Sequence, residues 1–555
     1  MNAKMTGAQA VVRTLKQEGI ERIFAVPGLQ LDHLFNALYD EGAAAPRVFG
    51  CRHEQGAGYM AFGAAQSTGR PSAFAVVPGP GFLNASAALA TAYACNAPVL
   101  ALSGQILSHQ IGRAVGWLHE LPDQLAIGRG LSKWASRINH PAEVPGIVRQ
   151  AFAQMTSGRP RPVYLEVPMD VLAQVAEVDL ASGVSQRPRP GEGLDLEMIR
   201  AAAQCLGKAV NPMILVGGGI FGAEVELLAL AEMLQAPVVM TRNAFGVLDC
   251  RHPLALSEPA GHRVWAEVDT VLVVGTRFQP QTVGYARPNS FWGIDEALKV
   301  IRVDVDPVEI NRLNKPHIAI VGDARSTLAA LLDEVPRHNQ KRTPRAQEFN
   351  RIKLALKAEL YSKIAPQMAY LDAIRAELPE DGFFVEELTQ IGYAARFAFP
   401  TYRARTYVST GYQGTLGFGF ATALGVKAAN PDKVVVSICG DGGFMFTAAE
   451  LATAAQHGIA TVTVIFNDNA FGNVRRMQQV EHGGRVIASE LRNPDFVAFG
   501  KSFGIDSERA HGPSELRAAL KRAFARNAPT LIEVPLGEMP DPWQFVRLPT
   551  VRGPR

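Results

Sequence analysis

Short apolar runs alternate with helix-length segments along the whole chain. Runs rich in Val, Ile and Leu at 213–216, 434–439 and 460–466 have the length of strands, whereas 85–93, 224–234 and 447–457 have the length of helices. Continuous apolar runs are typical of strands buried on both faces, and strands that alternate with helices form parallel sheets. The pattern predicts an α/β fold of doubly wound parallel sheets.

Two segments interrupt this alternation. Residues 187–191 and 336–345 are rich in Pro or in polar side chains and sustain neither pattern, which predicts linkers. At 555 residues the chain is also longer than one hydrophobic core usually holds. We therefore expect three doubly wound domains, at 1–185, 192–335 and 360–555.

The ends of two predicted strands carry the polar groups of a metal-held diphosphate site. Run 434–439 leads into Gly440-Asp441-Gly442-Gly443, and run 460–466 leads into Asn467-Asp468-Asn469. A βαβ unit places both strand ends at one edge of a parallel sheet, where such sheets bind ligands. Two side-chain oxygens there suit Mg²⁺, and glycine N–H groups suit phosphate. Taken alone, Gly-Asp-Gly is also typical of a tight turn.

A second glycine motif points toward a different ligand. Residues 217–222 read GGGIFG after a predicted strand, which matches the GxGxxG pattern of dinucleotide sites. Those sites also need an acidic residue at the end of the next strand to hold the ribose. Here the strand at 237–240 ends in Thr241-Arg242. The motif therefore predicts a tight strand-to-helix turn rather than a nicotinamide site.

Composition narrows the class of protein. With 55 basic and 52 acidic residues the formal net charge is +3, too small to favour nucleic acid or an anionic membrane as partner. The five cysteines have no metal-ligand spacing and are interpreted as buried thiols of a reducing compartment. Neither a signal-peptide layout nor an apolar run of membrane-spanning length is present, so a cytoplasmic location is expected.

Further motifs extend over almost the whole length. These motifs are FAVPG at 24–28, CRHEQGA at 51–57, GPGFLN at 79–84, SGQ at 103–105 and VDVDPVEIN at 303–311. Together with the Gly-Asp-Gly and Asn-Asp-Asn segments, they resemble the thiamine diphosphate enzymes of the acetolactate synthase and 2-oxo acid decarboxylase superfamily. The resemblance implies a pyrimidine-binding first domain, a central domain and a diphosphate-binding third domain.

The resemblance also implies roles for single residues. Glu54 would be the catalytic glutamate that hydrogen-bonds the aminopyrimidine ring of the cofactor, although acidic residues at helix starts are common for electrostatic reasons alone. Leu416 would be the wedge between the cofactor's two rings, or else ordinary core. Mg²⁺ would be held by Asp441, Asp468 and Ala470. The other cofactor-binding residues implied are Pro27, Gly28, Asn84, Gln390, Gly414, Gly442, Gly443 and Gly472.

The choice of reaction is argued from positions near the reacting carbon. The resemblance places Leu29, Gln105, His119 and Met477 there, and the stretch 76–79 lacks the histidines of family decarboxylases. Few proton donors favour carboligation, in which a 2-oxo acid such as pyruvate donates to a carbonyl acceptor. We therefore predict an acetolactate synthase-like carboligase. A non-oxidative decarboxylase or other C–C lyase and a non-catalytic thiamine diphosphate-binding paralogue remain the alternatives.

The resemblance carries two further expectations. Acetolactate synthases hold FAD in the central domain, but here Gln279 stands where they commonly carry Asp, and residues 259–261 replace their Met-His-Gly turn. These departures favour a domain without tightly held FAD and leave FAD open. In the family, the two halves of one site come from different subunits, so we expect a homodimer or homotetramer.

Overall fold

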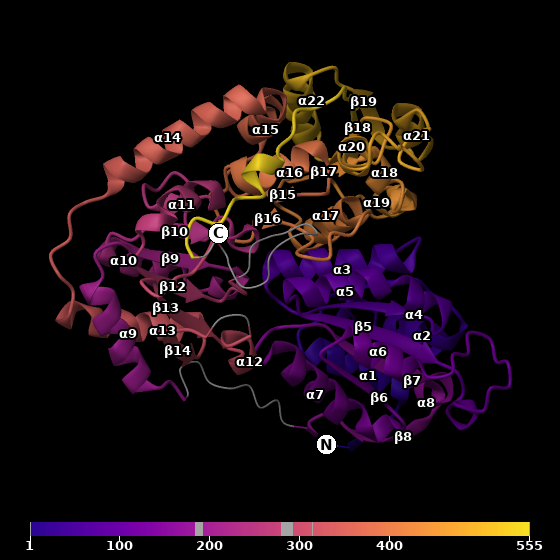
Figure 1. Ribbon diagram of the computed structural model, residues 1–555. Coiled ribbons are helices and arrows are strands. Elements are labelled where there is room, and N and C mark those ends of the chain that lie inside the picture. The colour runs from indigo at the N-terminus through magenta and orange to yellow at the C-terminus, as the bar shows by residue number, and fades with distance from the viewer. Residues whose placement is uncertain (1, 184–192, 279–291, 313–314, 554–555) are drawn as a thin grey trace. The chain divides into compact units, whose positions relative to one another are not determined.

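The computed structural model describes residues 2–183, 193–278, 292–312 and 315–553. It contains three six-stranded parallel sheets flanked by helices, which confirms the predicted fold class (Figure 1). The described chain groups into two compact units. One contains Met1–Arg187, Thr410–Arg509 and Arg522–Val534, and the other contains Pro188–Ser409, Ala510–Lys521 and Pro535–Arg555.

The first sheet has the order β3-β2-β4-β5-β7-β6, and all of its strand pairs are parallel. Its strands are β2 (Arg22–Ala25), β3 (Arg47–Gly50), β4 (Ser72–Val76), β5 (Val99–Gln105), β6 (Trp134–Arg137) and β7 (Val163–Pro168). Its helices are α1 (Gly7–Gln17), α2 (Asp32–Glu41), α3 (Glu54–Thr68), α4 (Pro80–Asn84), α5 (Ser86–Cys95), α6 (Gln124–Leu131), α7 (Val144–Thr156) and α8 (Met169–Ala173). An antiparallel pair, β1 (Asn2–Thr6) with β8 (Val175–Asp179), lies outside this sheet.

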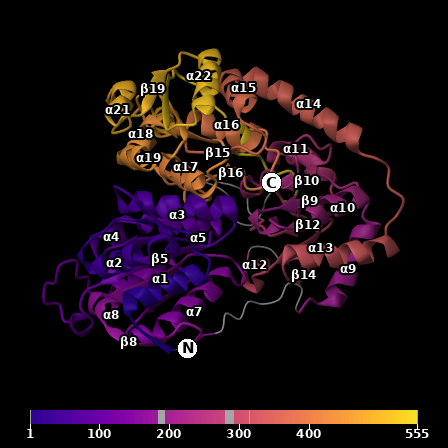
Figure 2. The same ribbon diagram turned by 180° about the vertical axis from the view of Figure 1, so that it is seen from behind.

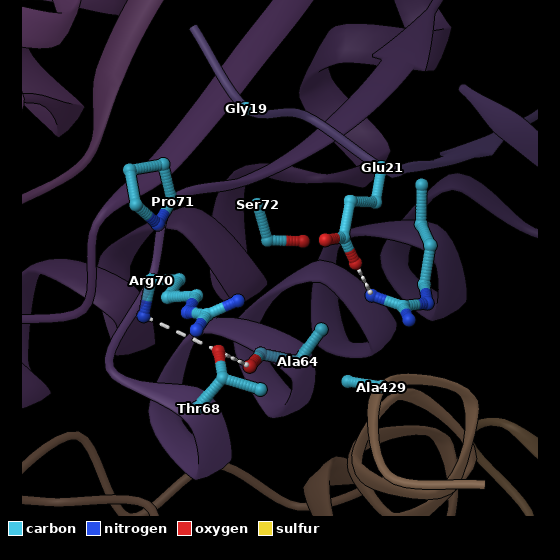
Figure 3. Close-up of a pocket in the computed structure, with 9 residues that line it drawn as sticks. Gly19, Glu21, Ala64, Thr68, Arg70, Pro71, Ser72 and Ala429 are labelled. Carbon is cyan, nitrogen blue, oxygen red and sulfur yellow. Dashed lines mark hydrogen bonds and ion pairs between the residues drawn. The ribbon is translucent and has the colours of Figure 1, made fainter. Parts of the chain in front are cut away.

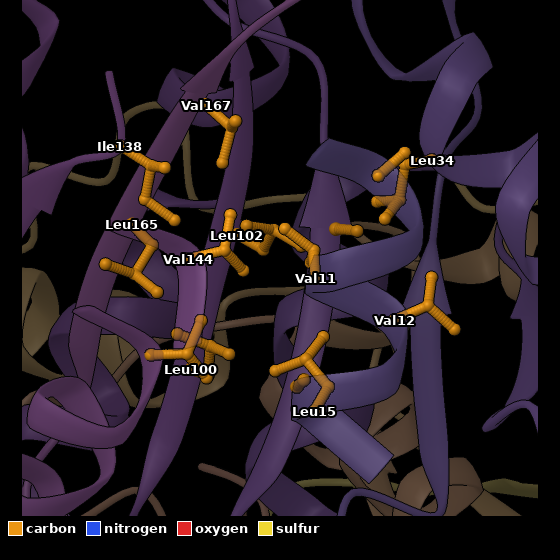
Figure 4. Close-up of a cluster of buried hydrophobic side chains, with 14 of the residues drawn as sticks. Val11, Val12, Leu15, Leu34, Leu100, Leu102, Ile138, Val144, Leu165 and Val167 are labelled. Carbon is orange, nitrogen blue, oxygen red and sulfur yellow. The ribbon is translucent and has the colours of Figure 1, made fainter. Parts of the chain in front are cut away.

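An aliphatic core fills the space between this sheet and α1. Val11 and Leu15 of α1 face Leu100 and Leu102 of β5, as Figure 4 shows, and Val12 belongs to the same buried cluster. Each of these side chains is at most 3 % exposed. Thr6 caps α1 with a complete capping box, in which its hydroxyl accepts from Gln9 N and the Gln9 side chain accepts from Thr6 N. The apolar period of the sequence thus determines which face of α1 is buried.

The second sheet has the order β11-β10-β9-β12-β13-β14 and is parallel throughout. Its strands are β9 (Pro212–Val216), β10 (Val238–Met240), β11 (Ala255–Leu256), β12 (Thr270–Val274), β13 (Lys299–Asp304) and β14 (Ile318–Val321). The helices of this region are α9 (Leu196–Lys208), α10 (Glu224–Leu234), α11 (Glu258–Val264), α12 (Pro307–Ile310), α13 (Ala324–Glu334) and the long α14 (Ala346–Lys363), which Figure 2 shows from behind.

The third sheet has the order β16-β15-β17-β18-β20-β19. Its strands are β15 (Phe383–Val385), β16 (Tyr407–Val408), β17 (Val435–Gly440), β18 (Val462–Asn467), β19 (Asp506–Arg509) and β20 (Thr530–Pro535). The helices are α15 (Ala365–Glu377), α16 (Gln390–Ala398), α17 (Phe418–Ala429), α18 (Asp441–Phe444), α19 (Leu451–His457), α20 (Gly472–Glu481), α21 (Phe496–Ser502) and α22 (Pro513–Arg526).

Most predicted elements are confirmed, with some corrections. The helix predicted at 447–457 begins only at Leu451, because a 3-10 turn (Ala448–Glu450) precedes it. Cys205 and Cys250 are half-buried, whereas the other three cysteines are buried as predicted, and all five thiols are free. The predicted linker at 187–191 lies outside the described residues, as does Gln279. In the described part of the chain, no helix is long and apolar enough to cross a membrane.

Candidate active site

The ends of β17 and β18 bring two carboxylates to one edge of the third sheet. The strands pair in parallel, with Gly440 opposite Phe466, so Asp441 and Asp468 follow at the same edge. This confirms the predicted βαβ unit. Asp441 is 1 % exposed, and the side chain of Asp468 is 13 % exposed. The nearest basic group to Asp468 is the Arg475 guanidinium, whose Nη2 lies 3.8 Å from Asp468 Oδ2.

Both carboxyl groups resist ionisation in this setting. Burial, together with the neighbouring Asp468 carboxylate, raises the pKa of Asp441 to about 6, against the lowering effect of a hydrogen bond from Asn493. Burial likewise raises the pKa of Asp468, which Arg475 counteracts. Two partly buried carboxylates that repel each other favour a cation between them.

Asn493 occupies a position that the sequence did not reveal. Its Nδ2 donates to Asp441 Oδ2 at 2.6 Å and lies 3.2 Å from the side-chain oxygens of both Asn467 and Asn469. Three acceptor oxygens therefore converge on one electropositive nitrogen. Asn493 lies 52 residues after Asp441, in the connection that follows α20, and no spacing rule links the two.

This donor set fits a hard divalent cation bound to a diphosphate. Among the described residues there is no group of three or more His, Cys, Asp or Glu side chains that could hold a metal. A cation bound by these two carboxylates therefore needs further oxygen ligands. A main-chain carbonyl such as that of Ala470 and the diphosphate itself can provide them. Ala470 is buried and bridges to Glu490, which fixes the turn after β18. Gly442 and Gly443 lie in α18, where a Cβ on Gly442 would come within 2.5 Å of Phe471.

The remaining predicted residues of the third domain lie on one loop and in two helices. Gln390 begins α16, and its buried Oε1 has no hydrogen-bond partner in the described structure. Gly414 has φ +58° and is exposed. Leu416, two residues later, is only half-buried, which is not typical of a core residue. Gly472 begins α20, and Met477 lies half-buried one turn further along that helix.

In the first domain, Glu54 is the first residue of α3. Asn84 Nδ2 donates to Glu54 Oε2 at 2.9 Å, so two residues of the predicted site contact each other directly. A Cβ added to Gly81 would lie 3.5 Å from Glu54 Oε1 and 2.7 Å from Val77 Cγ2. The glycines of the 79–81 loop therefore let the main chain approach the glutamate closely.

The same loop contacts the segment that carries His119. A Cβ on Gly79, whose φ is +62°, would lie 2.6 Å from the carbonyl oxygen of His119. Gln30 fixes this segment: its Nε2 donates to Leu118 O at 2.9 Å, and its Oε1 lies 3.0 Å from His119 Nδ1. Glu54 and His119 thus lie on either side of the Gly-Pro-Gly loop.

The other predicted residues of this domain differ in exposure. Pro27 and Leu29 are exposed, and Gly28 packs so closely on Val77 that a Cβ would lie 2.6 Å from Val77 Cγ1. Gln105 is 3 % exposed and points inward, where its Nε2 lies 3.3 Å from Glu166 Oε2 and its Oε1 accepts from Ile106 N. These contacts hold the Gln105 side chain against Glu166 of β7.

A small pocket lies away from these residues. Figure 3 shows it lined by Glu21, Thr68, Arg70, Pro71 and Ser72, with Gly19, Arg22, Ala64 and Ala429 completing the lining. Arg22 and Ser72 are the first residues of β2 and β4. Ligands of parallel sheets bind at the carboxyl ends of strands, so this pocket is at the wrong edge for the predicted chemistry.

Comparison with known proteins decides the family. Three thiamine pyrophosphate enzyme models match the chain in order: the N-terminal TPP binding domain at residues 5–127, the central domain at 199–331 and the C-terminal TPP binding domain at 389–534. The chain belongs to the thiamine pyrophosphate enzymes. The domains matched are thiamine diphosphate-binding domains, since pyrophosphate and diphosphate name the same group.

Its relatives include both decarboxylases and synthases. The chain is 35 % identical to a probable 2-ketoarginine decarboxylase of Pseudomonas aeruginosa, with 96 % of this chain and 94 % of the relative aligned. It is 33 % identical to a probable acetolactate synthase large subunit of Methanocaldococcus jannaschii (96 % and 92 % aligned) and 29 % identical to the isozyme 1 large subunit of Escherichia coli acetolactate synthase (96 % and 94 %). The predicted superfamily is confirmed.

Proposed function

We propose that this protein is a thiamine diphosphate- and Mg²⁺-dependent carboligase that decarboxylates a 2-oxo acid and joins the remaining acyl group to a second carbonyl compound. The observation that supports the cofactor site best is the convergence of Asp441, Asp468 and the Asn oxygens at the ends of β17 and β18. When bound, thiamine diphosphate supplies the electron sink for the bond that breaks next to the carbonyl.

Different residues of the chain would bind the metal ion and the phosphate groups. Asp441, Asp468 and the main-chain carbonyl of Ala470 would hold Mg²⁺, because carboxylate and carbonyl oxygens are its preferred protein ligands. Gly442 and Gly443 add no side chains of their own at the start of α18, where main-chain N–H groups suit phosphate oxygens. Gln390 is assigned to the cofactor only by the resemblance to the family.

Glu54 would act on the aminopyrimidine ring. Its carboxylate hydrogen-bonds Asn84 and lies against Gly81, so its orientation is restricted before any ligand arrives. A preorganised carboxylate loses little entropy on binding its partner. Holding a proton at the ring is the only acid–base task the chain must perform there, which agrees with the absence of a Ser/His/Asp set among the predicted site residues.

A second copy of the chain is proposed to complete the site. Several large apolar side chains beside the predicted cofactor residues are at least 41 % exposed: Leu29, Leu83, Leu118, Met445 and Phe446. All five belong to the unit that contains Glu54 and Asp441. Exposed apolar side chains next to a binding site are typical of a surface that another subunit covers. We propose a homodimer or a homotetramer, as the resemblance to the family implies.

Carboligation is favoured by the apolar character of the first-domain residues. Leu29 and Leu118 are apolar, and the stretch 76–79 contains no histidine. Where protonation of the carbanion is slow, a second carbonyl compound can trap it instead. The sequence similarity to acetolactate synthases supports pyruvate as the donor.

Simple decarboxylation is the second candidate, and His119 favours it. The main chain of His119 lies against Gly79, so a histidine is next to the loop that itself contains none. The similarity to a probable 2-ketoarginine decarboxylase points the same way and suggests a 2-oxo acid with a guanidino group. In that reaction the aldehyde one carbon shorter would leave after protonation.

A panel of donors separates the candidates. The purified protein with thiamine diphosphate and Mg²⁺ is incubated with pyruvate, with 2-ketoarginine, and with each donor plus a second carbonyl compound, and CO₂ and organic products are quantified. The carboligase proposal expects CO₂ matched by a ligation product. Stoichiometric free aldehyde would support the decarboxylase instead, and absence of CO₂ with every donor would favour a non-catalytic paralogue. His119→Gln should reduce aldehyde release only if His119 supplies the proton.

A further inference from the structure

Glu450 is a buried carboxylate that the proposed chemistry does not use. It ends the 3-10 turn after α18 and precedes α19, and it is 0 % exposed. Its oxygens accept hydrogen bonds from the main-chain N–H of Arg52, at 3.1 and 3.2 Å, and from that of His53, at 2.9 Å. The Thr453 hydroxyl donates to it as well. A buried anion with this many donors is well satisfied, so its position is strongly defined.

The two amides that Glu450 binds immediately precede Glu54. Arg52 and His53 form the turn from β3 into α3, and His53 caps the helix, with its Nδ1 accepting from Gln55 N at 3.1 Å. The direction in which α3 leaves this turn determines where the Glu54 carboxylate lies. Glu450 therefore restrains the main chain directly before Glu54, where a small rotation of the turn would displace the Glu54 carboxylate.

The first turn of α3 is shaped to receive Glu450. A Cβ on Gly56 would lie 2.2 Å from Glu450 Oε1 and 2.6 Å from Glu450 Cδ. Only glycine at this helical position leaves room for the carboxylate. His457, from the same α19 segment, adds a contact on the other side of the turn, because its Nε2 lies 3.0 Å from Gly50 N.

We infer that Glu450 is a positioning residue for Glu54: by holding the amides of Arg52 and His53, it orients the carboxylate that acts on the cofactor. The inference rests on the role proposed for Glu54. It assigns Glu450 no contact with cofactor or substrate. It also means that the segment after β17 contributes, through the main chain before α3, to the orientation of the catalytic glutamate.

The first test needs no cofactor. Glu450→Gln keeps the size of the side chain but replaces one acceptor oxygen with an NH₂ that faces N–H donors. In the cofactor-free protein, hydrogen–deuterium exchange of the peptide covering 51–57 should become about tenfold faster, as expected when hydrogen bonds to a charged acceptor are lost. Gln456→Ala is the control, since Gln456 Oε1 accepts from the Arg52 guanidinium, at 2.7 Å, rather than from its main-chain N–H. Unchanged exchange in Glu450→Gln would overturn the inference.

The second test asks whether Glu450 acts through Glu54. The readout is deuterium exchange at the thiazolium C2 position of bound thiamine diphosphate, which requires no substrate and is independent of whether the enzyme ligates or only decarboxylates. Glu450→Gln should slow this exchange by about tenfold or more, with cofactor affinity retained, as expected for a misplaced catalytic group. In a Glu54→Gln background the same substitution should have no further effect. An equal slowing in both backgrounds would indicate a general structural role and overturn the inference.

A second variant keeps the experiment decisive if Glu450→Gln does not fold. Gly56→Ala leaves the Glu450 charge intact but places a methyl group where the carboxylate lies. It should give the same pattern: slower C2 exchange that disappears in the Glu54→Gln background. Wild-type exchange in a folded Gly56→Ala protein would contradict the inference. A failure to make acetolactate would bear only on the proposed function and not on this inference.

Discussion

At the scale of single residues, the main electrostatic feature of the site is the repulsion between two carboxylates that lie partly buried at one edge of a sheet. Asp441 and Asp468 face each other, and burial raises the pKa of each. Asn493 donates to Asp441, and its Nδ2 also lies near the Asn467 and Asn469 oxygens. The proposed Mg²⁺ would offset this repulsion, to which the diphosphate alone would add.

The first prediction concerns Asp468. Asp468→Asn should retain cofactor binding, because the amide oxygen can replace the carboxylate oxygen. Asp468→Ala should raise the Mg²⁺ concentration required by at least about tenfold, a loss seen even for outer-shell partners of metals. The measurement is a Mg²⁺ titration of the cofactor-free protein at fixed thiamine diphosphate. Asn469→Ala is the matched variant; if it alone shifts the titration, Asn469 and not Asp468 is the ligand.

The second prediction concerns Glu258, at the start of α11. Its Oε1 is buried without a hydrogen-bond partner in the described structure, and burial raises its pKa to about 7, against the opposing charges of Arg242 and Arg396. The folded protein then binds more protons than the unfolded chain between the ordinary and the raised pKa, so this group lowers stability as pH rises from about 4.5 to 7. Glu258→Gln removes that loss.

We therefore compare the free energy of unfolding of Glu258→Gln with that of the wild type. The difference should shift in favour of Glu258→Gln by about 2 kcal/mol from pH 5 to pH 8. Urea unfolding at the two pH values measures it. Glu380→Gln is the control, because Glu380 is exposed and its hydrogen bond with Arg251 lowers its pKa, so no such gain is expected. An equal difference from wild type at both pH values would show that Glu258 does not titrate in this range.

The sequence predicted which residues lie close together where they follow neighbouring strands of one motif. Asp441 and Asp468 follow adjacent strands, so their proximity could be read from the chain. The contacts of Asn493 and Glu450 could not, because they come from segments whose folding brings them to the site without a fixed spacing. The role predicted for Gln105 stays a prediction, but its hydrogen bond with Glu166 of β7 could not be read from the sequence.

At the scale of elements, α3 and α17 cross at unusually close range. A Cβ on Gly63 of α3 would lie 2.2 Å from Thr422 O, and one on Gly425 of α17 would lie 1.9 Å from Met60 O. Both helices belong to the same compact unit. Main-chain atoms of one helix thus occupy the space that a side chain would need on the other, and the position of α3, which begins with Glu54, depends on these glycines.

The third prediction follows from this contact. Gly63→Ala and Gly425→Ala should each destabilise the protein by about 1–3 kcal/mol through overpacking, despite the better helix propensity of alanine. Gly130→Ala in α6 is the control, since nothing lies within 4 Å of its Cβ; it should be neutral or stabilising by up to about 1 kcal/mol. Urea unfolding midpoints compare the three variants. Equal stability of all three would mean that the two helices can separate at little cost.

Element boundaries show which physical effects the sequence pattern captured. Strand β17 was predicted within one residue and helix α10 at the same residues, because the apolar pattern is strong in both segments. The start of α19 was predicted four residues too early, since Ala448–Glu450 adopt a 3-10 turn. That turn places Glu450 against the amides before α3, a contact that local propensity does not encode.

At the scale of the whole molecule, the sequence sufficed for the number and type of sheets, because strand–helix alternation covers the chain. Apart from β17 and β18, the strand order within the sheets was not predicted, since pairing such as β18 beside β20 depends on non-local contacts. The pair of β1 with β8 was also missed, because its exposed residues alternate irregularly and lack the apolar pattern of a core strand.

The fourth prediction concerns the central domain. The departures at Gln279 and 259–261 lead us to expect that the purified protein is colourless and releases no stoichiometric flavin on denaturation. An absorbance spectrum before and after denaturation measures this. A near-equimolar flavin spectrum would contradict the expectation and would strengthen the similarity to acetolactate synthases.

The central claim is that Glu54 and the Mg²⁺-held cofactor act together in carboligation. The most direct measurement follows ¹³C-labelled pyruvate by NMR with wild-type protein, with and without a metal chelator, and with Glu54→Gln. The account predicts acetolactate from the wild type with Mg²⁺, none with chelator, and a rate at least about a hundredfold lower for a Glu54→Gln protein that still binds cofactor. Formation of acetolactate by Glu54→Gln at the wild-type rate, or of acetaldehyde alone by the wild type, would contradict it.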